Sequence, residues 1–285
     1  MLKANIETFL ACDASYEEAG IVLYGAPFDS TTSYRPGTRF GSRAIRSESY
    51  GLESYSPYQD RDLTDYAVFD AGDQELCFGD ASLALKDLRE RAAEVAGDGK
   101  IPFMLGGEHL VTLAPVQALA EKYPDLHIIH FDAHADLRED YLGVQYSHAC
   151  VLRRCWELLG DDRIYQFGIR SGDREEFRWA REGHVKMHKF NLDGLAEVIE
   201  KLQGKPVYIT LDLDVLDPSV FPGTGTPEAG GVTFVELMNA VIQTAQGVNV
   251  VGCDVNELSP VYDPSGVSTA VAGKIIREFL LALQV

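Results

Sequence analysis

The chain has 285 residues, of which 46% are hydrophobic and 24% charged, and its formal net charge is -19 at pH 7. This composition is ordinary for a globular protein with a large core, and the acidic balance excludes nucleic acid as an expected partner but suits cations. No apolar run approaches the roughly 18 residues that span a membrane, and the first residues lack a secretory pattern, so we expect a cytoplasmic protein without a membrane partner.

Strand-like and helix-like segments alternate along the chain. Apolar or β-branched runs predict strands at 21–27, 66–71, 101–105, 126–133, 163–169, 185–190, 206–213 and 248–255. Helical patterns fall at 41–51, 80–96, 111–122, 147–159, 173–182, 192–203, 233–246 and 265–283. Asp80, Thr233 and Ser265 are the candidate N-caps.

This alternation predicts one α/β domain over residues 1–285, with a mostly parallel sheet of about eight strands covered by helices on both faces. A closed eight-stranded barrel is the alternative, because hydrophobic periodicity does not separate the two architectures. The five cysteines are scattered and form no CxxC pair, so we expect free thiols: Cys12, Cys77, Cys150, Cys155 and Cys253.

Chemically unusual residues follow four of the predicted strands, at the point where each strand ends. They are His109, the set Asp132, His134 and Asp136, the pair Asp212 and Asp214, and the pair Asp254 and Glu257. Open parallel sheets and barrels both carry their sites at the carboxyl ends of strands. We therefore expect these side chains to meet at one edge of the sheet.

Two aspartate motifs, DAHAD and LDLD, indicate a metal site. In an extended chain, side chains two positions apart share a face, so Asp132, His134 and Asp136 would face one way, and Asp212 and Asp214 would lie side by side. Carboxylates this close repel one another unless cations lie between them, and carboxylates with imidazoles suit a divalent metal. The negative charge exceeds what one ion neutralises, which predicts a two-metal site of the kind that activates water.

The remaining histidines of the strand regions, and two cysteines on a helical pattern, are expected to be structural. His127, His130, His184 and His188 lie in or near strand bodies, away from the predicted edge, and Cys150 and Cys155 look like packing residues. None of them enters the predicted site.

Taken together, the motifs GGEH, FDAHAD, YSHA, LDLDVLDPSVFPGTGTPEAGG and NELSP resemble the ureohydrolase family of arginases and agmatinases. The segment PFDSTTSYRPGTRFGSRAIR at 27–46 resembles the N-terminal part of that family, so the resemblance covers nearly the whole chain. It implies a three-layer α/β/α sandwich around an eight-stranded parallel sheet, which favours the open sheet over the barrel. It also implies a homo-oligomer, either a trimer or a hexamer. GGEH departs from the commonest form, which has Asp before the His, but Glu108 keeps the charge.

The same resemblance implies a binuclear Mn²⁺ centre. One ion would be held by His109, Asp132, Asp136 and Asp212, and the other by Asp132, His134, Asp212 and Asp214. Glu257 matches the acid that pairs with the guanidinium group of the substrate, and His148, in YSHA, matches a proton-relay histidine. Asp136 would give the leaving amine its proton.

Residues 137–147, with the sequence LREDYLGVQYS, should line the mouth of the pocket. This loop has few of the Asn, Ser and Thr side chains with which arginases hold a substrate carboxylate, whereas Glu139 and Asp140 would tolerate a terminal ammonium. YSHA also resembles agmatinases more than arginases. We expect agmatine hydrolysis to putrescine and urea, with arginase, guanidinobutyrase and formimidoylglutamase activities as alternatives. Arg138 could hold a carboxylate or pair with a neighbouring acid.

Two functions of other kinds stay open at this point. The chain could be a relative that keeps the metal site as a non-catalytic binding or regulatory module. A relative of that kind would be free to lose a metal ligand, whereas all the predicted ligands are present in this sequence. A two-metal phosphoester hydrolase would need basic residues or a helix start for phosphate, whereas the predicted edge is acidic.

Overall fold

The computed structural model describes residues 6–284. Its central sheet contains β1 (Ile21–Ala26), β4 (Val68–Asp73), β5 (Ile101–Gly106), β6 (His127–Phe131), β7 (Ile164–Ile169), β8 (Lys186–Lys189), β9 (Pro206–Asp212) and β10 (Asn249–Asn256). The strands lie in the order β4-β1-β5-β10-β9-β6-β7-β8, and every neighbouring pair is parallel. β4 and β8 are open edges, so the predicted open sheet is confirmed and the barrel is excluded.

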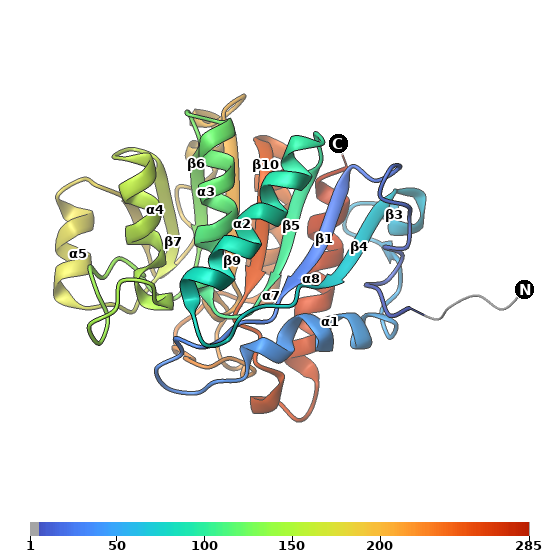
Figure 1. Cartoon of the computed structure of the whole chain (residues 1–285), viewed down its shortest axis with the longest axis horizontal. Helices are drawn as coiled ribbons and strands as arrows, with labels where there is room; N and C mark the ends of the chain where they lie inside the picture. The colour runs from blue at the N-terminus through green and yellow to red at the C-terminus, as the bar shows by residue number, and fades with distance from the viewer. Residues whose placement is uncertain (1–5, 285) are drawn as a thin grey trace, which may run out of the picture.

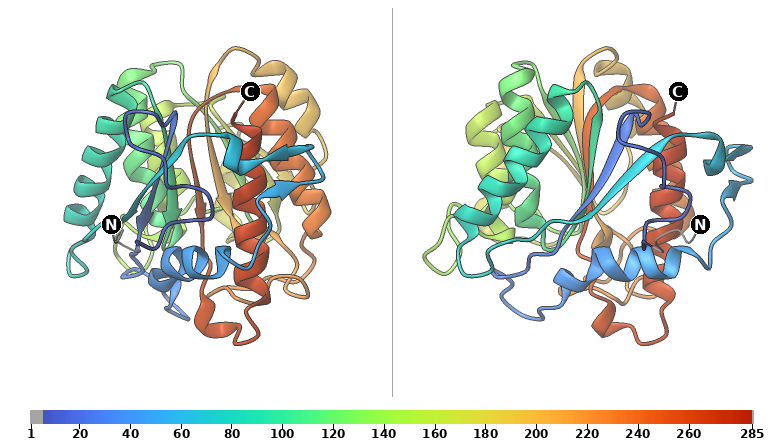
Figure 2. Two further views of the ribbon diagram at one scale, coloured as in Figure 1. Left: turned by 90° about the vertical axis from the view of Figure 1, so that its right-hand side faces the viewer. Right: turned by 45° about the vertical axis from the view of Figure 1, so that its right-hand side comes forward.

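Two layers of helices cover the sheet, as Figures 1 and 2 show. One face carries α2 (Ala81–Gly97), α3 (Leu113–Lys122), α4 (Val151–Leu159) and α5 (Arg174–Arg181). The other face carries α1 (Gly41–Ser49), α6 (Leu195–Lys201), α7 (Phe234–Gly247) and α8 (Val267–Ala282). The expected three-layer α/β/α sandwich is therefore confirmed.

Alternating side chains of the strands build a separate core on each face. In β9, Val207, Ile209 and Leu211 pack into the layer of α7 and α8, while Tyr208 packs into the layer of α2 and α3. All four are fully buried, because helices cover both faces of a parallel sheet. Burial on both faces explains why the strands are continuous apolar runs in the sequence.

The structure corrects the sequence-based prediction in three local features. A two-stranded hairpin, β2 (Tyr55–Ser56) and β3 (Arg61–Asp62), was not predicted, because its strands are very short. Its position depends on distant contacts, such as the hydrogen bond from Ser56 Oγ to Glu278 Oε2 of α8 at 2.6 Å. The helix predicted from residue 147 begins with a 3₁₀ turn, η4 (His148–Cys150), before α4.

The third correction concerns a helix cap. Asp80 and Thr233 cap α2 and α7 as predicted. Ser265 is not the N-cap of α8: the chain turns one residue later, at Gly266, whose φ of 76° favours glycine. Asp263 Oδ2 instead accepts a hydrogen bond from Ser268 N of the first turn at 2.7 Å.

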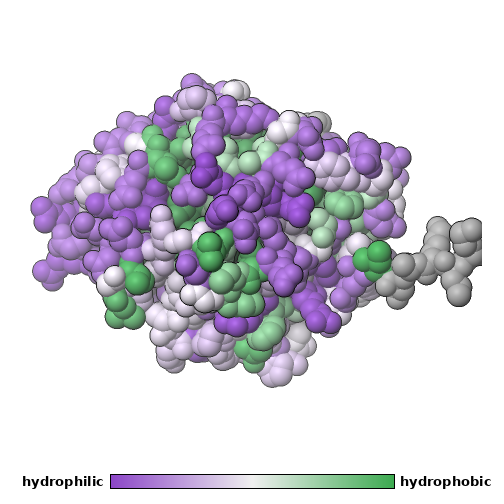
Figure 3. Space-filling model, in the orientation of Figure 1, coloured by the Kyte–Doolittle hydropathy of each residue, from purple (hydrophilic) through white to green (hydrophobic). Residues whose placement is uncertain are grey.

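Within residues 6–284, no helix is both long and apolar enough to cross a membrane. The face of the molecule drawn in Figure 3 is mostly hydrophilic, with small apolar groups scattered over it. All five cysteines are free thiols, as predicted. The single-domain assignment of residues 1–285 stays a prediction.

Candidate active site

The candidate site lies where four adjacent strands, β5, β10, β9 and β6, reach their carboxyl ends. His109 opens the 3₁₀ turn η3 (His109–Thr112) after β5, Asp132 follows β6, and Asp212 ends β9. Glu257 follows β10 and accepts a hydrogen bond from His109 N at 2.7 Å. The sheet order therefore brings together residues that lie up to 148 positions apart in the chain.

The chain reaches this arrangement through turns, which corrects the extended geometry expected for the two aspartate motifs. β6 ends at Phe131, and Asp136 adopts a left-handed φ of 53°. β9 ends at Asp212, whose Oδ1 accepts a hydrogen bond from Asp214 N at 2.8 Å in a 3₁₀ turn, η5 (Leu213–Val215). Short polar side chains bond readily to backbone two residues on, so alternating Asp residues favour turns here.

His109 points one ring nitrogen at three carboxylates. Its Nδ1 lies 3.0 Å from Asp132 Oδ2, 3.2 Å from Asp136 Oδ2 and 3.3 Å from Asp212 Oδ2. The ring is buried, and Nδ1 has no hydrogen-bond partner within the described residues. This nitrogen is therefore aimed at a cluster of negative oxygens.

The other ring nitrogen fixes the tautomer of His109. Thr210 Oγ1 donates its proton to Asp254 Oδ1 at 2.6 Å, so it can only accept a hydrogen bond from His109 Nε2, at 2.9 Å. The lone pair of neutral His109 is then on Nδ1, facing the carboxylates. A lone pair and three carboxylate oxygens repel one another unless a cation lies between them, so these residues fit a metal ion.

Without a metal ion, a proton on His109 Nδ1 can relieve the repulsion between this nitrogen and the carboxylates. Burial disfavours a charge on His109, but the carboxylates of Asp132, Asp136 and Asp212 next to Nδ1 still raise the pKa of the imidazole well above its usual range. Metal binding would displace this proton, as ligand sites of this kind require.

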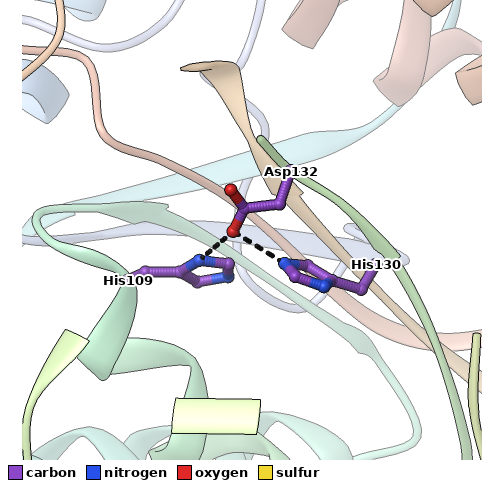
Figure 4. Close-up of side chains that lie close together, drawn as sticks. All are labelled: His109, His130 and Asp132. Atoms are coloured by element: carbon purple, nitrogen blue, oxygen red, sulfur yellow. Dashed lines mark hydrogen bonds and ion pairs between the residues drawn. The ribbon is translucent and has the colours of Figure 1, made fainter. Parts of the chain in front are cut away.

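His130 lies at the site, contrary to the expectation that it sits away from the edge (Figure 4). Its Nε2 lies 2.8 Å from Asp132 Oδ2, the oxygen that also faces His109. Gln166 Nε2 donates to Ala135 O at 2.7 Å and to His130 Nδ1 at 3.1 Å, so His130 Nε2 carries the proton. With both nitrogens engaged, His130 orients Asp132 and has no lone pair for a metal.

A second cluster shares Asp132 with the first. His134 Nδ1 lies 3.0 Å from Asp214 Oδ2 and 3.5 Å from Asp132 Oδ1, and the ligand atoms of these three residues lie within 4.8 Å of one another. Burial opposes a charge on His134, but Asp214 and then Asp132 raise its pKa. Two adjacent clusters with a common carboxylate are the arrangement that a pair of ions needs.

The carboxylates of the site cannot all ionise without cations. Burial, and then Asp132, raise the pKa of Asp136 to about 7. Burial and Asp214 raise the pKa of Asp212 well above its usual range, and burial with Asp214 does the same for Glu257. The site therefore has an excess of negative charge that divalent ions would neutralise.

A cavity of about 190 Å³ opens above these residues. His109, Asp136, His148, Asp212 and Glu257 line it, as the sequence predicts. Burial, and then the charge of His134, lower the pKa of His148 to about 4, so its ring is neutral near pH 7.

The loop at 137–147 only partly lines the cavity. Arg138 and Tyr141 reach it, whereas Glu139 and Asp140 line a neighbouring hollow, which corrects the expected place of the two acids. Arg138 Nε lies 3.4 Å from Glu176 Oε2, and Glu176 is buried, so Arg138 pairs with an acid.

Sequence reasoning missed several residues that support the site. They are Thr31, Glu176, His130, Gln166 and Thr210. Thr210 and His130 each precede a site aspartate by two positions, a signal that was visible in the sequence. Gln166 and Glu176 come from segments without a motif, and Thr31 lies in the segment 27–46, to which no site role was assigned, so only the folded chain places these three residues at the site.

The fold and the site together define an α/β enzyme whose carboxylates and imidazoles can hold metal ions. A model of the arginase family matches residues 19–282. Agmatinases from Bacillus subtilis (strain 168) and Bacillus anthracis are 51% and 50% identical, each over 277 residues that cover 96% of this chain and 96% of the relative. The solved agmatine ureohydrolase of Thermoplasma volcanium has a TM-score of 0.90 and 35% identity, covering 99% of this chain and 95% of that one.

The chain belongs to the arginase family. It is a hydrolase of that family, and the resemblance identified in the sequence is confirmed.

Proposed function

We propose that this enzyme hydrolyses agmatine to putrescine and urea with two Mn²⁺ ions. Agmatinases about half identical over nearly the whole length support the substrate. The observation that carries the proposal is the charge of the cavity. Arg138 is the one Lys or Arg among its described lining residues, and it already pairs with Glu176. The cavity therefore favours a cationic substrate without a carboxylate.

The metal ligands in this proposal are those of the two clusters. His109, Asp132, Asp136 and Asp212 would hold one ion, and Asp132, His134, Asp212 and Asp214 the other. Four aspartates match the charge of two divalent ions, and carboxylates with imidazole suit Mn²⁺. When bound, the ions supply Lewis acidity and a water molecule that loses a proton near neutral pH.

Glu257 would hold the guanidinium group. Its carboxylate lines the cavity, and Oε1 accepts from His109 N, which fixes the carboxylate beside the cluster. A planar guanidinium pairs with a carboxylate through directed, charge-assisted hydrogen bonds. Fixing the reacting carbon in this way lowers the entropic part of the barrier.

Proton transfer would fall to Asp136 and His148. Expulsion of the amine from the tetrahedral intermediate requires a proton, and Asp136 lines the cavity in which the substrate would bind. His148 also lines the cavity and is neutral near pH 7, so it can take up a proton and pass it to or from solvent.

The alternative activities predicted from the sequence fit the cavity less well. Arginine, 4-guanidinobutyrate and formimidoylglutamate carry a carboxylate, for which the described cavity lining offers no unpaired Lys or Arg. The same charge disfavours a phosphoester. A non-catalytic role is disfavoured because His148 and Glu257 are both present beside the clusters.

The resemblance to the family supports three further parts of the proposal. Putrescine would serve polyamine biosynthesis, the enzyme would work in the cytoplasm, and it would assemble as a trimer or hexamer. Each concerns the whole protein in the cell and not the geometry of one chain.

The proposal is tested by urea release from the Mn²⁺-loaded protein with agmatine, arginine and 4-guanidinobutyrate measured side by side. We expect kcat/KM to be highest for agmatine. A preference for arginine or 4-guanidinobutyrate would overturn the substrate, and absence of urea from all three would overturn the reaction.

A further inference from the structure

Glu108 is a buried carboxylate next to the site that the proposed reaction does not use. It is inaccessible to solvent, and all of the described hydrogen bonds of its carboxylate come from two threonines of the segment between β1 and η1 (Thr38–Phe40). Thr31 Oγ1 donates to Oε1 at 2.6 Å, while Thr31 N and Thr32 Oγ1 each donate to Oε2 at 3.0 Å. Glu108 therefore joins this N-terminal segment to the end of β5.

Thr31 also contacts His148. His148 N donates to Thr31 Oγ1 at 3.1 Å, and His148 Nδ1 lies 3.4 Å from the same oxygen. A hydroxyl has one proton to donate and two lone pairs that accept. When Glu108 is ionised its carboxylate has no proton to give, so the Thr31 proton goes to it at 2.6 Å and Thr31 Oγ1 can only accept from His148.

This constraint favours one tautomer of the neutral imidazole. With the ring proton on Nδ1, Thr31 Oγ1 and Ser147 Oγ, each 3.4 Å away, can both accept from it, whereas with the proton on Nε2 only the Ser147 hydroxyl could bond Nδ1, as a donor. The favoured tautomer therefore carries its proton on Nδ1. The lone pair is then on Nε2, which forms no hydrogen bond with any residue between 6 and 284. Since His148 lines the cavity, Nε2 is the atom that can accept a proton there.

We propose that Glu108 is a positioning residue that sets the orientation and tautomer of His148 through the hydroxyl of Thr31. This inference rests on the proposed role of His148 in proton transfer. Glu108 acts only through Thr31. Removal of the link should therefore change the proton-transfer step and leave metal binding and substrate binding nearly intact.

Three threonine variants separate this role from a structural one. Thr31→Val keeps the branched shape but removes the hydroxyl, Thr31→Ser keeps the hydroxyl, and Thr32→Val removes the other hydroxyl on Glu108, which has no described bond to His148. General acid–base groups contribute about 100-fold or more, so we expect Thr31→Val to lower kcat for agmatine by about 10- to 100-fold at unchanged KM. Thr31→Ser should restore kcat, and Thr32→Val should stay within about 2-fold of the wild type.

A nuclear magnetic resonance experiment reads the tautomer directly. Imidazole ¹⁵N shifts of His148 are measured in the full chain loaded with diamagnetic Mg²⁺, because Mn²⁺ broadens nearby signals. The wild type should show a protonated Nδ1. In Glu108→Gln the amide can donate to Thr31 Oγ1 and release its proton toward Nδ1, so the population should move to the Nε2–H tautomer. Unchanged shifts in both Glu108→Gln and Thr31→Val would overturn the proposal.

His148→Asn distinguishes failure of this inference from failure of the proposed function. If His148→Asn leaves kcat unchanged, the proposed proton relay is wrong, and the ¹⁵N shifts alone decide the role of Glu108. If His148→Asn lowers kcat, Thr31→Val added to it should cost less than about 2-fold more, because both changes remove one contribution. A fully additive loss would contradict the link through Thr31.

Discussion

The metal cradle and the wall loop of this site differ in what holds them in place. The cradle consists of His109, Asp132, His134, Asp136, Asp212 and Asp214, and the wall loop is residues 137–147. Four adjacent strand ends position the cradle, and five of its six side chains belong to residues with 6% exposure or less. The wall loop exposes Leu142 and Val144, and a bridge between Tyr141 and Val144 closes it locally.

This difference implies that the cradle carries the catalytic groups, whereas the wall loop affects only which substrate fits the cavity. Buried carboxylates in the cradle are costly unless cations neutralise them, so the proposed function assigns each cradle residue to metal binding and catalysis. The wall loop borders the cavity with only two side chains, Arg138 and Tyr141, and we expect it to tolerate substitution of the others. Substitutions should therefore have large effects in the cradle and small effects in the wall loop.

The largest effect is expected for Asp214→Ala. The change removes a carboxylate from the cluster of Asp132 and His134, so the protein should bind one fewer ion. Activity should fall by more than about 100-fold, because even outer-shell changes at metal sites cost about 10- to 100-fold. Metal content by mass spectrometry and urea release check both effects, with circular dichroism as the control for folding. Two bound ions and full activity would show that Asp214 is not a ligand.

A smaller effect on catalysis, with both ions retained, is expected for Glu257→Gln. The amide oxygen can still accept from His109 N, but the charge that attracts a guanidinium is gone. A hydrogen bond to a charged group contributes about 1.5–3 kcal/mol, so kcat/KM for agmatine should fall by about 10- to 100-fold. Steady-state kinetics measure the loss. If the variant loses a metal ion instead, Glu257 belongs to the cradle.

The cradle also predicts how the metal-free protein responds to pH. Burial and Asp132 raise the pKa of Asp136 from 3.8 to about 7, and burial with Asp214 raises that of Asp212. A raised folded-state pKa means that the folded state holds protons which the unfolded state has released. The stability that these two carboxyl groups contribute is therefore full below about pH 4 and is lost as pH rises through their folded-state pKa values, about 7 for Asp136.

The pH response is measured as thermal unfolding of the metal-free protein between about pH 4 and 7, compared with the Mn²⁺-loaded protein. The metal-free Tm should fall across this window, and Mn²⁺ should stabilise the protein more at the upper end, where the carboxylates ionise readily. Asp136→Asn is the matched variant and should flatten the slope. A metal-free Tm that rises between pH 4 and 7 would contradict the charge excess of the cradle.

The smallest effect is expected in the wall loop. Glu139 and Asp140 line the neighbouring hollow and not the cavity, so Glu139→Gln and Asp140→Asn should change kcat/KM for agmatine by less than about 2-fold. Losses near 10-fold in steady-state kinetics would restore these acids as substrate contacts. They would also remove the contrast between the cradle and the wall loop.

The cradle was predictable because strand ends carry its residues. Apolar runs located the strands that precede His109, Asp132 and Asp212, and parallel strands place such ends at one edge. The backbone conformations of the segments that follow these strands were not predictable in the same way. Asp136 and Glu257 adopt left-handed φ values of 53° and 66°, which alternation along an extended strand does not foresee.

Supporting contacts from distant segments were not predictable. Gln166 fixes the tautomer of His130 from β7, and Glu176 pairs with Arg138 from α5. Neither residue belongs to a motif. The first contact depends on the register of β6 and β7, which pairs His130 with Gln166, and the second depends on how the loop after β6 packs against α5. The wall loop illustrates the same limit, since its two acids point into the neighbouring hollow.

The most direct test of the cradle is a crystal structure of the Mn²⁺-loaded protein with anomalous diffraction measured at the manganese absorption edge. Two peaks should appear, one beside His109 Nδ1 and one beside His134 Nδ1, with Asp132 between them, at the roughly 3.5–4 Å separation of two-metal sites. A single peak among His109, His130 and Asp132, or no peak among these residues, would contradict the binuclear centre.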